Sequence, residues 1–175
     1  MVPVISFVGN SGVGKTTFLE KLIRVLKARG YRVAAIKHDA HRFEIDYPGK
    51  DSWRLTEAGS DVVIISSRDK LALVERPETE RSLVGLVQMV SDRVDIVLTE
   101  GYRGAAAMKI EVSRKAHSHV LTARLDDLIA IVTDERFDYR VPQFDLDDAP
   151  GVADFLERRY APRPSRPTPA VRERS

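Results

Sequence analysis

The sequence predicts an α/β fold with three layers, in which a mostly parallel, twisted sheet contains an antiparallel hairpin and carries helices on both faces. Three observations support this prediction. Short apolar runs rich in β-branched residues alternate with helical patterns, as in proteins with parallel sheets. A glycine-rich turn joins the first apolar run to the first helical pattern. Two later apolar runs are separated only by Arg68, Asp69 and Lys70, a connection typical of a hairpin.

The first strand is expected over Val4–Val8, and the turn after it has the pattern G-x-x-x-x-G-K-T of a phosphate-binding P-loop. Its glycines let successive backbone N–H groups turn inward around a polyphosphate, and a helix from Lys15 adds the positive end of its dipole. Lys15 would neutralise the β- and γ-phosphates, and the Thr16 hydroxyl would hold Mg²⁺. The predicted nucleotide-binding residues are Gly9, Asn10, Ser11, Gly12, Val13, Gly14, Lys15, Thr16 and Thr17. The predicted fold is therefore that of the P-loop NTPases.

Apolar residues then recur at helical spacing up to Gly30, which is placed to end this helix. A second strand is expected over residues 32–37, and the order strand, turn, helix, strand makes a right-handed βαβ unit. Residues 38–50 are polar and aromatic and form a longer loop than a simple crossover needs. A short capped helix is expected over residues 51–58.

The hairpin is expected to pair residues 61–67 with 71–75, so one of these strands should run antiparallel within a mixed sheet. A helix follows over residues 80–91, and another core strand over residues 94–100. The remaining expected elements are strands over 109–112, 128–133 and 141–146 and a helix from Pro150 to about Tyr160.

Residues 1–160 are expected to form one P-loop domain. Residues 161–175 contain four prolines and four arginines without apolar periodicity, which predicts a disordered tail. The tail carries a net charge of +3, so the total of +2 leaves residues 1–160 at −1. A folded part so close to neutral does not indicate a nucleic-acid partner.

The chain contains no cysteine, which excludes a disulfide framework, a thiolate metal site and a cysteine nucleophile. No apolar run approaches the thickness of a bilayer, and no secretory signal precedes the first strand. We therefore expect a cytoplasmic protein without a membrane partner.

Several polar clusters follow expected strands, at the edge where an open α/β sheet binds its ligand. Glu100 closes a strand beside the P-loop strand, where a carboxylate can hold the Mg²⁺ shell or orient water. We assign Lys15 and Glu100 as candidate catalytic residues; a solvated glutamate is the alternative for Glu100. Asp39 ends the second strand and could reach the same metal. Asp95 opens its strand, away from the phosphates, so we assign it a surface or capping role.

The residue that reads the base is less clearly indicated. The Asn-Lys-x-Asp run that usually reads guanine is absent, and Asn10 is the only asparagine. Asp134 nevertheless ends a suitable strand, and a carboxylate accepts from both N1–H and the exocyclic amine of guanine. The pair Thr133-Asp134 could equally cap a helix over residues 135–139. Both interpretations stay open here.

The chain also resembles a known family across residues 3–134. The P-loop apart, the resemblance rests on Lys37-His38-Asp39, His41, Phe43-Glu44-Ile45-Asp46, Pro48-Gly49-Lys50-Asp51-Ser52, Arg54, Ala58-Gly59, Glu100-Gly101-Tyr102 and Lys109-Ile110-Glu111. These residues resemble the molybdopterin-guanine dinucleotide biosynthesis adapter proteins, the MobB family. Arg103 departs from the lysine that is more common there. Many metallochaperone GTPases carry a lysine at the position that Asn10 occupies here. Its absence argues against a mechanism in which a lysine of one subunit reaches the nucleotide phosphates of the other.

The resemblance implies a GTP- and Mg²⁺-binding α/β protein, often a homodimer, that assists the guanylyltransferase joining GMP to molybdopterin. By this resemblance, the P-loop and Glu100 correspond to the nucleotide and metal positions of the family. The loop from His38 to Arg54 corresponds to a surface that faces the cofactor or partner. We call the residues expected to line that surface, and to contact the partner or molybdopterin, the rim residues. They are His38, His41, Lys50, Asp51, Arg54, Tyr102, Arg103 and Lys109. His38 and His41 have metal-like spacing, but two histidines without a third ligand favour hydrogen bonding or packing.

Two other functions stay open. A small-molecule kinase would need arginines over the γ-phosphate, and Arg42, Lys50 and Arg54 supply positive charge in the loop. A metallochaperone GTPase would need metal ligands, which the lack of cysteine and of a histidine-rich segment disfavours. As an enzyme, the chain is expected to be at most a slow GTPase.

Overall fold

The structure, a computed structural model, describes residues 2–39, 43–105 and 107–160. Two predictions lie outside these residues, the role of His41 and the disordered tail. The described chain divides into two compact units. One contains the residues up to His38 together with those from Leu83 onward, and we call it the P-loop unit. The other, Asp39–Ser82, we call the hairpin unit.

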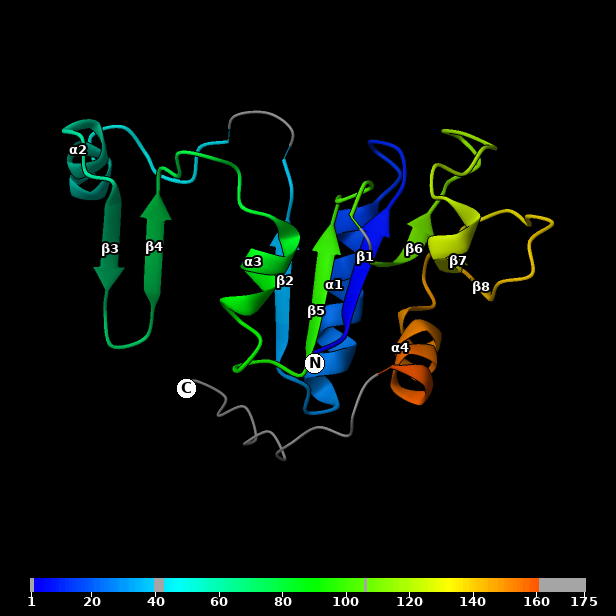
Figure 1. Cartoon of the computed structure of the whole chain (residues 1–175). Helices are drawn as coiled ribbons and strands as arrows, with labels where there is room; N and C mark the ends of the chain where they lie inside the picture. Colours follow the sequence, from blue (N-terminus) through cyan, green and yellow to red (C-terminus); the bar gives the residue numbers. More distant parts are fainter. Residues whose placement is uncertain (1, 40–42, 106, 161–175) are drawn as a thin grey trace. The chain divides into compact units, whose positions relative to one another are not determined.

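The P-loop unit is built on a six-stranded sheet with the order β2-β5-β1-β6-β7-β8 (Figure 1). Every neighbouring pair runs parallel. The strands are β1 (Val4–Val8), β2 (Val33–Lys37), β5 (Ile96–Glu100), β6 (Met108–Val112), β7 (Leu128–Val132) and β8 (Gln143–Phe144). Because β1 lies between β5 and β6, the carboxyl ends of both neighbours border the turn that follows β1.

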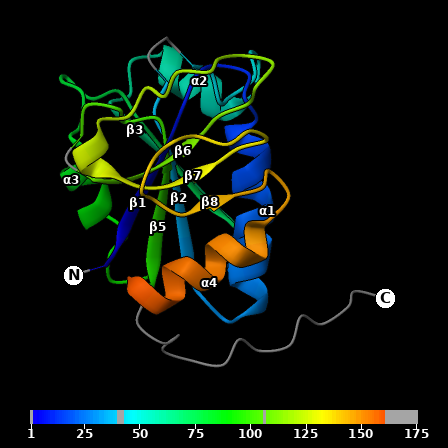
Figure 2. The same cartoon turned by 90° about the vertical axis from the view of Figure 1, so that its right-hand side faces the viewer.

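Helices cover both faces of this sheet, as the sequence predicts. They are α1 (Lys15–Ala28), α3 (Leu83–Gln88) and α4 (Ala149–Arg159), and a 3₁₀ turn, η1, spans Leu125–Asp127. Figures 1 and 2 show α3 on the opposite face of the sheet from α1. α1 packs against α4 and buries its apolar side, including Phe18 and Leu22. Arg29 joins the two helices through ion pairs to Asp154 at 2.7 Å and Glu157 at 2.8 Å.

Every strand predicted for the P-loop unit is present, but one helix and one strand are shorter than predicted. The helix expected over residues 80–91 is limited to α3, because Gly85 and the β-branched Val84 and Val87 favour helix weakly. The last strand shrinks from residues 141–146 to the two residues of β8, which follow Pro142. Proline has no N–H to donate, so it suits the start of a strand at a sheet edge.

The hairpin unit contains β3 (Val62–Ser66) and β4 (Leu71–Glu75), which pair antiparallel, and α2 (Asp51–Glu57). The hairpin itself is as predicted. The expectation that one of its strands joins a mixed sheet is wrong, because β3 and β4 form a separate two-stranded sheet. α2 packs on β3, in which Val63 is buried, while Ile64 and Leu73, which pair with each other, stay exposed.

Two charged side chains of the P-loop unit are buried in ion pairs, Asp95 directly before β5 and Lys109 on β6. Asp95 is only 6% exposed and accepts hydrogen bonds from the Arg32 backbone N–H at 2.8 Å and its guanidinium at 2.7 Å. The surface position expected for Asp95 is therefore wrong, although the carboxylate does cap a backbone N–H. Lys109 is 2% exposed and donates to Asp127 at 2.7 Å. It cannot present a free charge to a partner, so its prediction as a rim residue is corrected.

The pair Lys109–Asp127 makes stability depend on pH. The hydrogen bond from Lys109 holds the pKa of Asp127 below its ordinary value. A carboxyl group of this kind stabilises the fold above its ordinary pKa, and the contribution is lost as the pH falls through the lowered folded value. We expect Asp127→Asn to lower the melting temperature at pH 7, because the buried Lys109 ammonium loses its negatively charged partner.

The difference from the parent protein should shrink below pH 3.8, the ordinary value for this group. Thermal unfolding followed by circular dichroism at several pH values measures both effects. Asp126→Asn is the matched control, because this neighbour is exposed and lies 3.9 Å from Arg124. Equal melting temperatures for the two variants at pH 7 would contradict a structural role for the pair.

Candidate nucleotide-binding site

The P-loop runs from the end of β1 to the start of α1 and depends on glycine at three positions. Gly9, Gly12 and Gly14 have φ angles of 135°, 79° and 96°, which side chains disfavour. At Gly9 space is also lacking, since a Cβ would lie 2.2 Å from the carbonyl oxygen of Val112 at the end of β6. The first intrahelical bond, from Phe18 N–H to the Gly14 carbonyl at 2.9 Å, closes the loop directly into α1. The backbone thus has the conformation expected of a P-loop, and its binding of a phosphate stays a prediction.

Lys15 lies folded over the beginning of this loop. Its ammonium donates to the carbonyl oxygens of Asn10 at 2.8 Å and Gly9 at 3.2 Å. Burial lowers the pKa of Lys15; Glu100 opposes this, whereas the positive charges of Arg103 and Lys37 add to it. A positive group that is partly desolvated among other cations gains from a nearby anion. Lys15 thus lies over the loop, and its contact with a phosphate stays a prediction.

Thr16 and Glu100 come together next to Lys15. The Thr16 hydroxyl donates to Glu100 Oε2 at 2.7 Å, and Glu100 lies opposite Phe7 in the register of β5 and β1. A hydroxyl and one carboxylate at the start of a P-loop helix fit Mg²⁺, which takes few protein ligands and completes its shell with water and phosphate. Among the described residues there is no cluster of three or more aspartate, glutamate or histidine side chains that could hold a metal ion. Asp39 belongs to the hairpin unit, and its metal contact stays a prediction.

Arg103 lies on the P-loop, although the sequence assigned it to the partner surface. Its guanidinium donates to the Gly9 carbonyl at 2.5 Å. The turn that carries it is tight, since Gly101 and Tyr102 both have positive φ angles and the Tyr102 ring lies 4.9 Å from the His38 ring. His38 and Tyr102 thus pack against each other, which matches the packing expectation for His38.

Sequence analysis missed two residues beside the loop, Arg114 and His117. Arg114 Nε donates to the Val13 carbonyl at 3.5 Å, and its terminal nitrogen lies 3.6 Å from where a Cβ on Gly14 would stand. The His117 ring approaches the corresponding point on Gly12 to 3.1 Å. Both residues follow β6, which pairs with β1. Glu100 is predicted as a site residue because it ends a strand beside the P-loop strand. The same rule, applied to the segment that follows β6, would have indicated Arg114 and His117.

Asp134 borders a hollow of about 300 Å³ that lies against the P-loop helix. The hollow also contacts Gly14, Thr17, Lys21, Arg114 and Asp147. Asp134 accepts a hydrogen bond from the Lys115 backbone N–H at 2.7 Å. The alternative in which it caps a helix over residues 135–139 is wrong, because that segment is not helical. Thr133 instead accepts from the Glu135 N–H within a local turn.

The remaining rim residues lie in the hairpin unit. Lys50 is exposed directly before α2, and Asp51 forms a 3.6 Å ion pair with Arg54 in which both side chains face solvent. Such exposed pairs stabilise little. Their contact with a partner stays a prediction.

The fold and the loop together define a P-loop α/β protein. The family profile described as "Molybdopterin guanine dinucleotide synthesis protein B" (MobB) matches residues 4–134. The chain belongs to the MobB family.

Individual relatives agree over most of the chain. It is 36% identical over 161 residues to the molybdopterin-guanine dinucleotide biosynthesis adapter protein of Escherichia coli K12, covering 89% of this chain and 92% of the relative. The adapter protein of Haemophilus influenzae is also 36% identical, over 157 residues, with 89% and 88% covered. The crystal structure of Bacillus subtilis MobB superposes with a TM-score of 0.72 at 27% identity, covering 88% of this chain and 95% of that one.

The arrangement of Lys15 can be tested directly. We expect Lys15→Ala to weaken triphosphate binding at least tenfold, because hydrogen bonds to charged groups contribute about 1.5–3 kcal/mol each. Isothermal titration calorimetry with GTP measures the loss, and an unchanged melting temperature shows that the fold persists. Lys27→Ala, in the last turn of α1, is the matched control and should bind like the parent. An unchanged dissociation constant for Lys15→Ala would contradict the phosphate site.

Proposed function

We propose that this chain binds GTP with Mg²⁺ and acts as an adapter that assists the attachment of GMP to molybdopterin. The observation that carries the proposal is the P-loop between β1 and α1, with Lys15 over it and Thr16 paired to Glu100, in a member of the MobB family. The relatives named above are described as adapter proteins of molybdopterin-guanine dinucleotide biosynthesis. This description fits a protein that holds a nucleotide tightly and turns it over slowly.

Each residue around the loop has a defined task in this proposal. Backbone N–H groups of residues 10–16 and the Lys15 ammonium bind the phosphates. Thr16 and Glu100 would hold the Mg²⁺ ion, which neutralises phosphate charge when bound. Arg103 and Arg114 lie beside the loop at Gly9 and Val13 and add positive charge there. A weak intrinsic GTPase, with turnover on the order of 10⁻⁴ per second, is consistent with such a site when no partner supplies an arginine to the transition state.

We propose Asp134 as the guanine reader. It lines a hollow that also contacts Gly14 and Thr17 of the P-loop, so a nucleotide with its phosphates in the loop can extend its base in this direction. A carboxylate accepts from both N–H groups of the guanine edge, which adenine cannot offer together.

Asp134→Asn is expected to lower GTP affinity about tenfold and to raise affinity for xanthosine triphosphate, because the amide can donate to the carbonyl that replaces the guanine amine. Competition binding against a fluorescent GTP analogue measures both. Asp138→Asn, four residues further along, is the control. Equal losses for GTP, ATP and xanthosine triphosphate would show that Asp134 only holds the loop through Lys115.

We further propose a cytoplasmic homodimer whose partners are the guanylyltransferase and molybdopterin itself. None of the helices in the described part of the chain combines the length and apolar character needed to cross a bilayer. Lys50 and Arg54 provide exposed positive charge on the hairpin unit, suited to an acidic protein surface or to the phosphate of molybdopterin.

The double variant Lys50→Ala/Arg54→Ala is expected to keep GTP affinity and to weaken the stimulation of GMP transfer to molybdopterin severalfold in a reconstituted assay. Removal of rim charges mainly slows association and changes its salt dependence. Arg68→Ala/Lys70→Ala removes the same charges from the exposed hairpin turn and is the matched control. If both double variants stimulate transfer like the parent, Lys50 and Arg54 are ordinary surface residues.

A further inference from the structure

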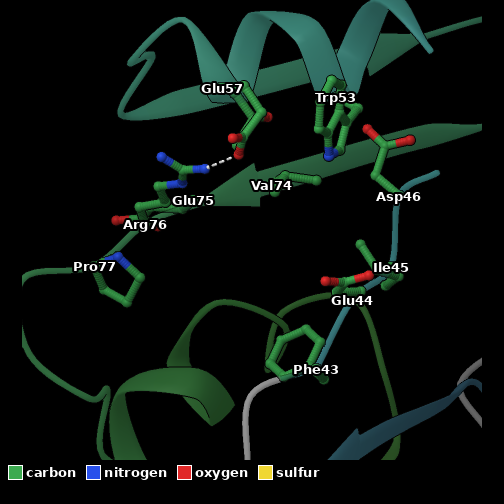
Figure 3. Close-up of a pocket in the computed structure, with 11 residues that line it drawn as sticks. Phe43, Glu44, Ile45, Asp46, Trp53, Glu57, Val74, Glu75, Arg76 and Pro77 are labelled. Atoms are coloured by element: carbon green, nitrogen blue, oxygen red, sulfur yellow. Dashed lines mark hydrogen bonds and ion pairs between the residues drawn. The ribbon is translucent and has the colours of Figure 1, made fainter. Parts of the chain in front are cut away.

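The hairpin unit contains a cavity of about 970 Å³ (Figure 3). It is bounded by residues 43–46, by one side of α2 and by residues 74–77 at the end of β4. All of these residues belong to the hairpin unit. The volume is at the upper end of the range found for small-molecule sites. Neither the P-loop nor the proposed base site uses it.

Aromatic and aliphatic side chains form two walls of the cavity. Trp53 projects from α2 toward β4, and Phe43 lies on the opposite side (Figure 3). Phe43 is 71% exposed and Ile45 is 74% exposed, although both line the cavity. Aromatic and aliphatic side chains left this exposed around a hollow are suited to a flat ligand that packs against them.

The polar lining is rich in hydrogen-bond acceptors. Of its carboxylates, Glu57 is paired with Arg76 at 2.6 Å and Glu75 with Arg81 at 2.5 Å. Asp46 is different. Its Oδ1 accepts from the Tyr47 N–H at 2.9 Å, whereas its Oδ2 is shielded from solvent and has no donor among the described residues.

A buried carboxylate oxygen without a donor is rare in native structures. Rotation about the Cβ–Cγ bond, a broad torsion in aspartate, would present this acceptor to a molecule in the cavity. Glu44 adds a second carboxylate nearby (Figure 3). The cavity therefore favours a flat ligand that donates hydrogen bonds and disfavours an anionic one.

We propose that this cavity binds the 2-amino-4-oxopyrimidine edge of a pterin ring. On that edge a ring N–H and an exocyclic amine point the same way, so one carboxylate can accept from both. The bicyclic ring would stack on Trp53 or Phe43, and its phosphate-bearing substituent would stay outside the acidic lining. Guanine has the same edge. The choice of pterin rests on the proposed function, in which the P-loop unit already holds the guanine nucleotide.

The chain offers a direct probe of this site, because Trp53 is its only tryptophan. Titration of the full chain with 6-hydroxymethylpterin should change Trp53 emission to saturation, and equilibrium dialysis with the same compound should give the same dissociation constant. Asp46→Asn should weaken binding about tenfold, the loss expected for one charge-assisted hydrogen bond. Asp69→Asn, at the hairpin turn outside the cavity, should bind like the parent.

Related compounds test the chemistry of the edge. Lumazine has a carbonyl in place of the exocyclic amine and should bind more weakly than the pterin. If guanosine binds as tightly as the pterin, the pterin assignment is overturned and the cavity is a guanine site. If N-acetylargininamide binds and the pterin does not, the cavity takes a basic side chain of a partner protein, which also overturns the proposal.

Two variants separate this proposal from the function of the P-loop. Lys15→Ala should lose GTP and keep the pterin, whereas Asp46→Asn should do the reverse. If the parent protein binds GTP but no pterin, the cavity proposal fails and the proposed nucleotide function stands. If it binds the pterin but no GTP, the nucleotide function fails and the cavity proposal stands. An unchanged melting temperature shows that Asp46→Asn still folds. If it does not fold, Glu44→Gln, which removes the second carboxylate of the cavity, is expected to show the same loss of pterin affinity.

Discussion

The parallel pairing of β1 with β5 on one side and β6 on the other is the constraint on which the nucleotide site depends. It brings the end of β6 so close to the P-loop that only glycine fits at position 9, opposite the Val112 carbonyl. The same pairing delivers Glu100 from β5 to the Thr16 hydroxyl and Arg114 from β6 to the Val13 carbonyl. A central strand with two parallel neighbours thus gathers residues that are far apart in sequence at one edge of the sheet.

The charges gathered at this edge favour an anion. Burial is the main cause of the lowered pKa of Lys15; Glu100 opposes the shift, and the positive charges of Arg103 and Lys37 add to it. A bound polyphosphate would relieve this unfavourable environment, and Thr16 and Glu100 would hold a metal ion that neutralises phosphate charge. Arginine at position 103 suits its contact, because a guanidinium can donate to the Gly9 carbonyl and keep other N–H groups for a ligand.

The hairpin unit has a different chemistry. It has a two-stranded sheet with α2 against one strand, exposed apolar side chains and a cavity lined by carboxylates and aromatic rings. An acidic, aromatic cavity and a basic, glycine-rich loop select opposite kinds of ligand group. A protein with both can hold a nucleotide and a second heteroaromatic molecule without competition between them.

The sequence by itself determined the P-loop, the order of strands and helices around it, the hairpin and the position of Glu100 at the end of a strand beside the P-loop strand. These follow from local patterns and from the rule that ligands bind at the carboxyl ends of parallel strands. Only the tertiary structure decided that the hairpin forms a sheet of its own, that Lys109 is buried against Asp127, that Arg103 lies on the P-loop and that residues 135–139 are not helical. The reason is physical. Turn chemistry and hydrophobic period act between residues close in sequence, whereas burial of a charge and the partner of a long side chain depend on strands that meet only after folding.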